Sequence, residues 1–157
     1  MEEKLAELYN KLANQIVDII PVEWEEVNYL GEVGKGKLSS GSVFYFKDKN
    51  ITLQCHKIPE IYHVSKDIYM ELFRNLDHIL LEIYDCFIED GQEPWEQLSL
   101  SFNAEGKFKI EFFYNVMENP EVGPLAREVI WAYRTFGYEP ESSYWKEQLH
   151  QYLKKQS

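Results

Sequence analysis

The segment that most limits the possible fold is a long apolar stripe over residues 65–90. Its apolar positions step by four, four, three, four and four residues, which places them on one helical face: Ile68, Leu72, Leu76, Ile79, Ile83 and Phe87. Ser65 is suited to cap this helix and Gly91 to end it. At about 1.5 Å per residue the helix is roughly 39 Å long. We therefore expect a central helix that crosses a whole small sheet.

The strand signals on either side of this helix come in groups. Alternating apolar and polar residues predict a three-strand meander over 24–33, 43–47 and 51–55, and a hairpin over 97–114. Amphipathic patterns predict further helices over residues 5–19, 124–137 and 142–153. Grouped strands favour an α+β fold, in which an antiparallel sheet of about five strands is covered by the N-terminal helix, the central helix and two C-terminal helices. The strand order stays open.

Length and charge narrow the function classes. The chain has 157 residues, enough for one ordinary domain, and we expect a single domain over residues 1–157. It carries 27 acidic and 16 basic side chains, a net charge of −11, which disfavours direct binding to nucleic acid and favours a basic protein partner. No signal peptide or membrane-spanning run is recognised, so we expect a cytoplasmic protein without a membrane partner.

No recognised pattern of catalytic or metal-binding residues occurs. The glycine-rich loop over 34–41 lacks the order of a phosphate-binding loop, and the two cysteines, Cys55 and Cys86, form no CxxC pair. The sequence therefore predicts no catalytic residue, cofactor or metal site. A small enzyme built from His56, His63 and Glu60 stays open as an alternative.

Acidic residues form one pattern of interest. Glu82, Asp85 and Glu89 fall at positions i, i+3 and i+7 of the central helix, and the negative run continues past its end. A solvated helix face explains this stripe, and so does a docking surface for a basic partner. Under the second interpretation the candidate partner-binding residues are Glu82, Asp85, Glu89, Glu93, Trp95 and Glu96.

Four segments, in the same order, resemble the YezG-like immunity (antitoxin) proteins. They are residues 20–27 (IPVEWEEV), 91–95 (GQEPW), the hairpin over 102–114 and the ending over 127–140. The resemblance implies a cytoplasmic antitoxin that binds and neutralises a cognate toxin, commonly a nuclease exported by a type VII secretion system. It brings no catalytic residues and no cofactor, and it leaves the oligomeric state open. An acidic adaptor without a toxin partner remains the other interpretation.

Overall fold

The computed structural model describes residues 1–156 and divides into two compact units, Met1–Asn115 and Val116–Ser157. The first unit holds one sheet and the helices before it and within it, and the second unit holds two helices. Each unit is compact by itself, but compactness alone does not define a domain. One domain over residues 1–157 therefore stays a prediction.

The first unit is built on a five-stranded antiparallel sheet with the order β3-β2-β1-β4-β5. The strands are β1 (Glu26–Val33), β2 (Ser40–Asp48), β3 (Ile51–Gln54), β4 (Gln97–Asn103) and β5 (Phe108–Phe113). The predicted meander and hairpin are both present, which confirms the α+β class. The two groups join because β4 pairs with β1, so β1 becomes the central strand.

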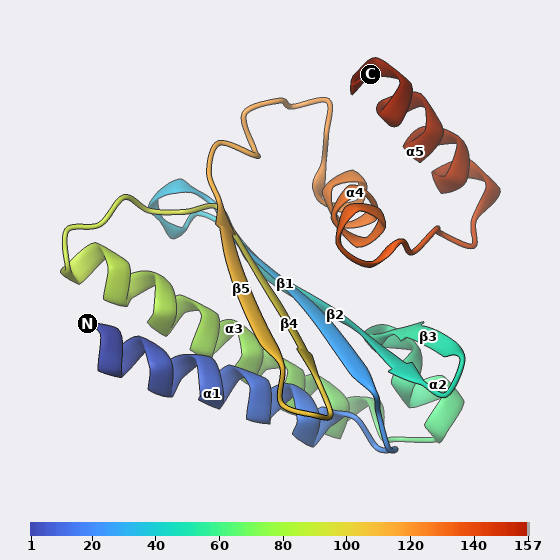
Figure 1. Cartoon of the computed structure of the whole chain (residues 1–157), viewed down its shortest axis with the longest axis horizontal. Helices are drawn as coiled ribbons and strands as arrows, with labels where there is room; N and C mark the ends of the chain where they lie inside the picture. Colours follow the sequence, from blue (N-terminus) through green and yellow to red (C-terminus); the bar gives the residue numbers. More distant parts are fainter. Residues whose placement is uncertain (157) are drawn as a thin grey trace. The chain divides into compact units, whose positions relative to one another are not determined.

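Two helices, α1 (Glu2–Ile19) and α3 (Lys66–Glu89), lie side by side across one face of this sheet (Figure 1). The Oγ of Ser65 accepts a hydrogen bond from the Ile68 N–H at 3.5 Å, so the predicted cap begins α3. Gly91 follows the helix with a φ of +72°, a conformation that favours glycine. The apolar faces of the two helices and the facing side of the sheet form the core of this unit.

Helix α3 lies close to the sheet at Gly31 of β1. A Cβ atom at this position would lie 2.5 Å from Cδ1 of Leu80 and 2.8 Å from the Tyr29 hydroxyl. The Tyr29 hydroxyl is in turn hydrogen-bonded to Ser42 Oγ at 2.7 Å, and Ser42 donates to the Asp77 carboxylate of α3. A glycine in the middle of the central strand thus makes room for the helix above it.

The opposite face of β1 and β4 carries polar side chains that bond to each other. Asn28 and Ser101 are directly opposite in the register, and Ser101 Oγ donates to Asn28 Oδ1 at 2.6 Å. Glu32 and Gln97 are also opposite, and Gln97 Nε2 donates to Glu32 Oε2 at 2.7 Å. These cross-strand pairs satisfy polar groups that are otherwise expensive to bury.

Three short elements of the first unit were not predicted from the sequence. They are η1 (Lys35–Lys37) in the glycine-rich loop, η2 (Cys55–Lys57) and α2 (Ile58–Tyr62). Pro59 stands in the first turn of α2, and His63 ends this helix with a φ of +56°. One or two helical turns are too short to show a periodic apolar pattern.

The second unit consists of α4 (Pro124–Phe136) and α5 (Ser143–Gln156), which pack against each other. Pro124 opens α4, and Gly137 ends it with a φ of +72°, as expected from the sequence. The guanidinium carbon of Arg134 lies 5.4 Å from the centre of the Tyr152 ring, which joins the two helices by a cation–π contact.

Candidate protein-binding surface

The three acidic residues of the predicted stripe lie on the outer side of α3 and are paired with lysines of other elements. Their side chains are between 43% and 70% exposed. The pairs are Lys11 Nζ to Glu82 Oε1 at 3.2 Å, Lys37 Nζ to Asp85 Oδ1 at 2.8 Å, and Lys4 Nζ to Glu89 Oε2 at 4.0 Å. The stripe is therefore partly neutralised by α1 and η1, which spacing along α3 alone cannot reveal.

Lys37 is the best-placed of these cations. It comes from the glycine-rich loop, where it has a φ of +57°, and its ammonium group is hydrogen-bonded to Asp85. That hydrogen bond and the charge of Asp85 raise the pKa of Lys37 above its ordinary value. Because both side chains are well exposed, the pair contributes little to stability.

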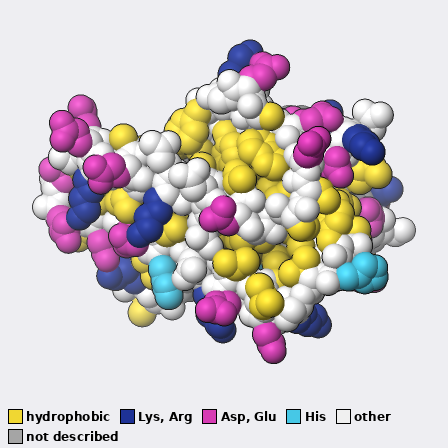
Figure 2. Space-filling model, turned by 90° about the horizontal axis from the view of Figure 1, so that it is seen from below, with side chains coloured by type: hydrophobic (Ala, Val, Ile, Leu, Met, Phe, Trp, Pro, Cys, Tyr) yellow, Lys and Arg dark blue, Asp and Glu magenta, His cyan; other side chains and the backbone are white. Residues whose placement is uncertain are grey.

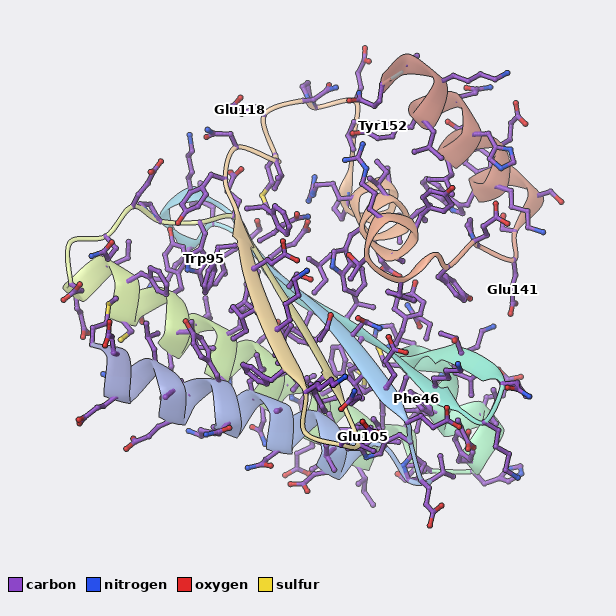
Figure 3. The ribbon with its side chains drawn as sticks, viewed as in Figure 1. Phe46, Trp95, Glu105, Glu118, Glu141 and Tyr152 are labelled. Atoms are coloured by element: carbon purple, nitrogen blue, oxygen red, sulfur yellow. The ribbon has the colours of Figure 1, made fainter. Side chains whose placement is uncertain are left out.

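Trp95 and Glu96, the other end of the predicted set, lie inside the molecule. Trp95 is 1% exposed and Glu96 is 6% exposed. The Trp95 ring packs edge-on against Tyr84 of α3 at 5.3 Å and at a tilt against Phe112 at 5.4 Å (Figure 3). Among the described residues, its indole N–H has no hydrogen-bond partner. Packing therefore holds Trp95 in place, and this side chain is not available on the folded surface.

A second group of carboxylates lies where α1 begins and α3 ends. The two helices are antiparallel: Lys4 reaches Glu89 at one end, and Gln15 Nε2 donates to the Leu72 carbonyl at 2.8 Å nearer the other. This arrangement brings exposed acidic residues of both helices and of the following loop together, as the left end of Figure 2 shows. We call this group the end patch, and its members are Glu2, Glu3, Glu7, Glu89, Asp90 and Glu93.

Two of the six members of the end patch oppose the local helix dipole. Glu2 and Glu3 occupy the first turn of α1, where negative charge stabilises a helix. Glu89 and Asp90 stand at the carboxyl end of α3, where negative charge is unfavourable, and the last turn of α3 holds no basic residue. Their placement is therefore not explained by helix stability.

Sequence reasoning found only part of this patch. Glu89 and Glu93 belong to the predicted set, whereas Glu2, Glu3 and Glu7 do not. The residue pattern of each helix alone does not show that the two helices pack against each other. Two long amphipathic helices on one face of a small sheet pack nearly antiparallel when the chain reverses between them, and this would have brought the two acidic ends together.

Of the residues named for a small enzyme, Glu60 lies in α2 and His63 at its end, and His56 has a structural role. His56 Nδ1 is hydrogen-bonded to the Tyr69 hydroxyl at 2.9 Å, and its ring lies 4.9 Å from that of Phe73. Burial raises the pKa of Tyr69 well above its ordinary value. Cys55 is fully buried, and its sulfur accepts a hydrogen bond from the Phe44 N–H at 3.5 Å. No group of three or more His, Cys, Asp or Glu side chains within residues 1–156 is arranged to hold a metal ion.

A groove of the second unit runs between α4, α5 and the loop before them. Its volume is about 530 Å³, and Leu125, Ile130, Trp145 and Tyr152 are among the side chains that line it. Leu125 is 61% exposed, and so is Tyr144 at the start of α5.

Among the described helices of both units, none combines the length and the apolar character needed to cross a lipid bilayer.

Comparison with known proteins places the whole arrangement in one family. A protein of Staphylococcus aureus (strain NCTC 8325 / PS 47) named type VII secretion system protein EsaG is 36% identical over 146 residues, which cover 91% of this chain and 88% of the relative. The immunity protein YezG of Bacillus spizizenii (strain ATCC 23059 / NRRL B-14472 / W23) is 33% identical over 153 residues, covering 96% and 94%.

A further relative, the immunity protein YezG of Bacillus subtilis (strain 168), is 29% identical over 151 residues, covering 95% of this chain and 99% of the relative. The sequence model described as "Immunity protein YezG-like" matches residues 5–150, so it extends over the sheet unit and both C-terminal helices. This chain therefore belongs to the YezG-like immunity protein family.

Proposed function

We propose that this protein protects its cell by binding a cognate toxin that carries a basic nuclease domain, and that it acts by stoichiometric binding without a reaction of its own. Membership of an immunity protein family supports the protective role. The observation that carries the choice of partner is the end patch, six exposed carboxylates at the end of the helix pair where Lys4 reaches Glu89.

A nuclease needs a cationic cleft to hold the phosphates of its substrate. Carboxylates on an inhibitor attract such a cleft over a distance and accept bidentate hydrogen bonds from its arginines. The end patch suits this task better than the middle of α3, because Glu82 and Asp85 form short ion pairs with lysines of the chain, at 3.2 and 2.8 Å, whereas the pair of Glu89 with Lys4 is longer, at 4.0 Å. Glu89 and Glu93 thus remain proposed contact residues, and the buried Trp95 and Glu96 have a structural role.

The name of the relative EsaG connects that protein with type VII secretion. By extension, we expect the toxin to leave the producing cell by that route and the immunity protein to act in the cytoplasm before export. Inhibition by occlusion of the cleft fits the charge argument. The alternative is that the immunity protein remodels the toxin away from its active site, in which case the end patch governs the encounter but not protection itself.

The first test is co-expression with the toxin encoded next to this gene. We expect the immunity protein to restore growth and to co-purify with the toxin in a fixed ratio. Loss of both results would leave an acidic adaptor without a toxin partner as the better description. Recovery of growth without any complex would contradict inhibition by binding.

A matched pair of charge reversals tests the end patch. Glu93 lies in the loop before β4, and Glu105, labelled in Figure 3, lies in the turn after it, so the two exposed residues stand beyond opposite ends of this strand. Glu93→Lys should slow association with the toxin about ten-fold at low salt, and Glu105→Lys should change it much less. Equal association rates for the two variants would remove the end patch from the mechanism.

A further inference from the structure

Strand β5 is an edge of the sheet with an unpaired side. Within the described part of the chain it pairs with β4 alone, and the other edge strand, β3, has only four residues. A free strand edge presents a row of N–H and C=O groups that can pair with another chain, and proteins usually shorten or shield such edges. β5 has six residues and no proline.

The ladder between β4 and β5 determines which backbone groups of β5 point outward. The Asn103 N–H donates to the Lys107 carbonyl at 3.0 Å, so these opposite residues form a hydrogen-bonded pair. Hydrogen-bonded and open positions alternate along an antiparallel ladder. Lys109 and Glu111 therefore bond toward β4, and the backbone groups of Phe108, Ile110 and Phe112 point to the free edge.

The side chains of β5 also leave apolar surface uncovered. Phe108 is 47% exposed and Phe113 is 37% exposed, at the two ends of the strand. The charged side chains that would protect the edge are Lys109 and Glu111 on the other face from Phe108. They neutralise each other through an ion pair of 3.2 Å, which reduces their ability to repel a neighbouring strand.

We propose that β5 pairs antiparallel with β5 of a second copy of this chain, about a two-fold axis through Ile110. The pairing joins two five-stranded sheets into one sheet of ten strands. It uses the outward backbone groups of Phe108, Ile110 and Phe112 on both copies, and it brings Phe108 of one copy opposite Phe112 of the other. The interaction does not depend on the toxin and goes beyond the proposed function.

Charge complementarity selects this partner and this register. An antiparallel pair places residues of the same face opposite each other, so a two-fold axis passes through one residue of the strand. An axis at Lys109 sets two lysines opposite each other, and an axis at Glu111 sets two glutamates opposite each other. An axis at Ile110 sets Lys109 opposite Glu111 of the other copy, twice.

The favourable pair stands at an open position of the new ladder. At such positions the opposite Cα atoms approach to about 4.5 Å, closer than in hydrogen-bonded pairs, so the side chains interact well. A six-residue strand offers a small contact, and we therefore expect a dimer that dissociates on dilution. A foreign strand has no reason to present the complementary order of charges at this spacing, whereas a second copy always does.

The test uses the full-length chain and two single charge reversals. Lys109→Glu sets glutamates opposite each other at both sites, and Glu111→Lys does the same with lysines. Each variant alone should dimerise at least ten-fold more weakly than the wild type in sedimentation velocity, a factor that corresponds to about 1.4 kcal/mol. An equimolar mixture of the two should form a heterodimer as tight as the wild-type dimer, because every opposite pair again carries opposite charges.

The mixture also serves as the control for folding. Both single variants lose the ion pair within the strand, so a recovered dimer cannot come from that pair. The double variant Lys109→Glu/Glu111→Lys exchanges the charges within one chain and should dimerise as the wild type does. A wild type that stays monomeric at all concentrations would overturn the proposal, and so would single variants that dimerise normally or a mixture that stays monomeric.

Discussion

At the scale of single residues, Gly31 has a role that follows from the space around it. Alanine at this position would set its Cβ against Leu80, which is fully buried, and against the Tyr29 hydroxyl, which Ser42 holds. We expect Gly31→Ala to lower the free energy of unfolding by about 1–3 kcal/mol, as overpacking does in other cores. Urea denaturation followed by circular dichroism measures this loss.

Gly41 of β2 is the matched control for Gly31. Nothing lies within 4 Å of a Cβ placed there, and its φ is one that other residues adopt. Gly41→Ala should change the free energy of unfolding by no more than about 0.5 kcal/mol. Equal denaturation midpoints for the two alanine variants would show that α3 does not need the glycine.

The buried phenol of Tyr29 makes the free energy of unfolding fall at alkaline pH. Its burial raises the pKa of the phenol well above the ordinary 10.0, and burial also raises the pKa of Tyr9, to about 12. Above about pH 10 the unfolded chain releases the Tyr29 proton and the folded chain keeps it. Stability therefore falls as pH rises, by about 1.4 kcal/mol per pH unit for each such group.

The Tyr29→Phe variant has no ionisable phenol at position 29. The free energy of unfolding, measured by urea denaturation at several pH values between about 10 and 12, should fall less steeply for the variant than for the wild type. Parallel slopes would mean that Tyr29 ionises equally in both states, which contradicts its burial.

At the scale of elements, periodic sequence patterns predicted individual helices and strands. The features that they did not predict depend on contacts between distant segments of the chain. The apolar steps of α3 and the alternation of the hairpin gave these elements within a few residues of their observed ends. Glycine is unusual inside a strand, and the reason for Gly31 in β1 lies on α3, which no local pattern of β1 shows. The strand order was not predicted, because the pairing of β1 with β4 joins segments about seventy residues apart.

The candidate site shows the same limit. The sequence placed Glu82, Asp85 and Glu89 on one helical face, and they do lie together on the outer side of α3. Their lysine partners come from α1 and η1, at sequence distances that no helical period relates to α3. The sequence also predicted that the partner-binding surface continues past the end of α3 to Trp95 and Glu96, but Trp95 is buried in the core there. Family resemblance, by contrast, depends on residues and their order, and it predicted the family directly from the sequence.

At the scale of the whole molecule, the negative charge is unevenly divided between the two units. Residues 1–115 contain 21 acidic and 11 basic side chains, and residues 116–157 contain six and five. Exposed charges are screened over about 8 Å at physiological ionic strength, which is short compared with a protein of this size. The attraction of a basic toxin should therefore depend on where a carboxylate lies and not on the net charge alone.

Two variants of equal net charge test this dependence on position. Glu2, Glu3 and Glu7 belong to the end patch, and their replacement by Gln changes the net charge from −11 to −8. The same change follows from Gln at positions 118, 121 and 147 of the second unit, where the wild type has Glu. Stopped-flow association with the toxin at rising salt should show a flatter salt dependence for the first variant and a nearly wild-type dependence for the second. Equal flattening in both would mean that the net charge steers the toxin regardless of position, and the end patch would then lose its place as the docking surface.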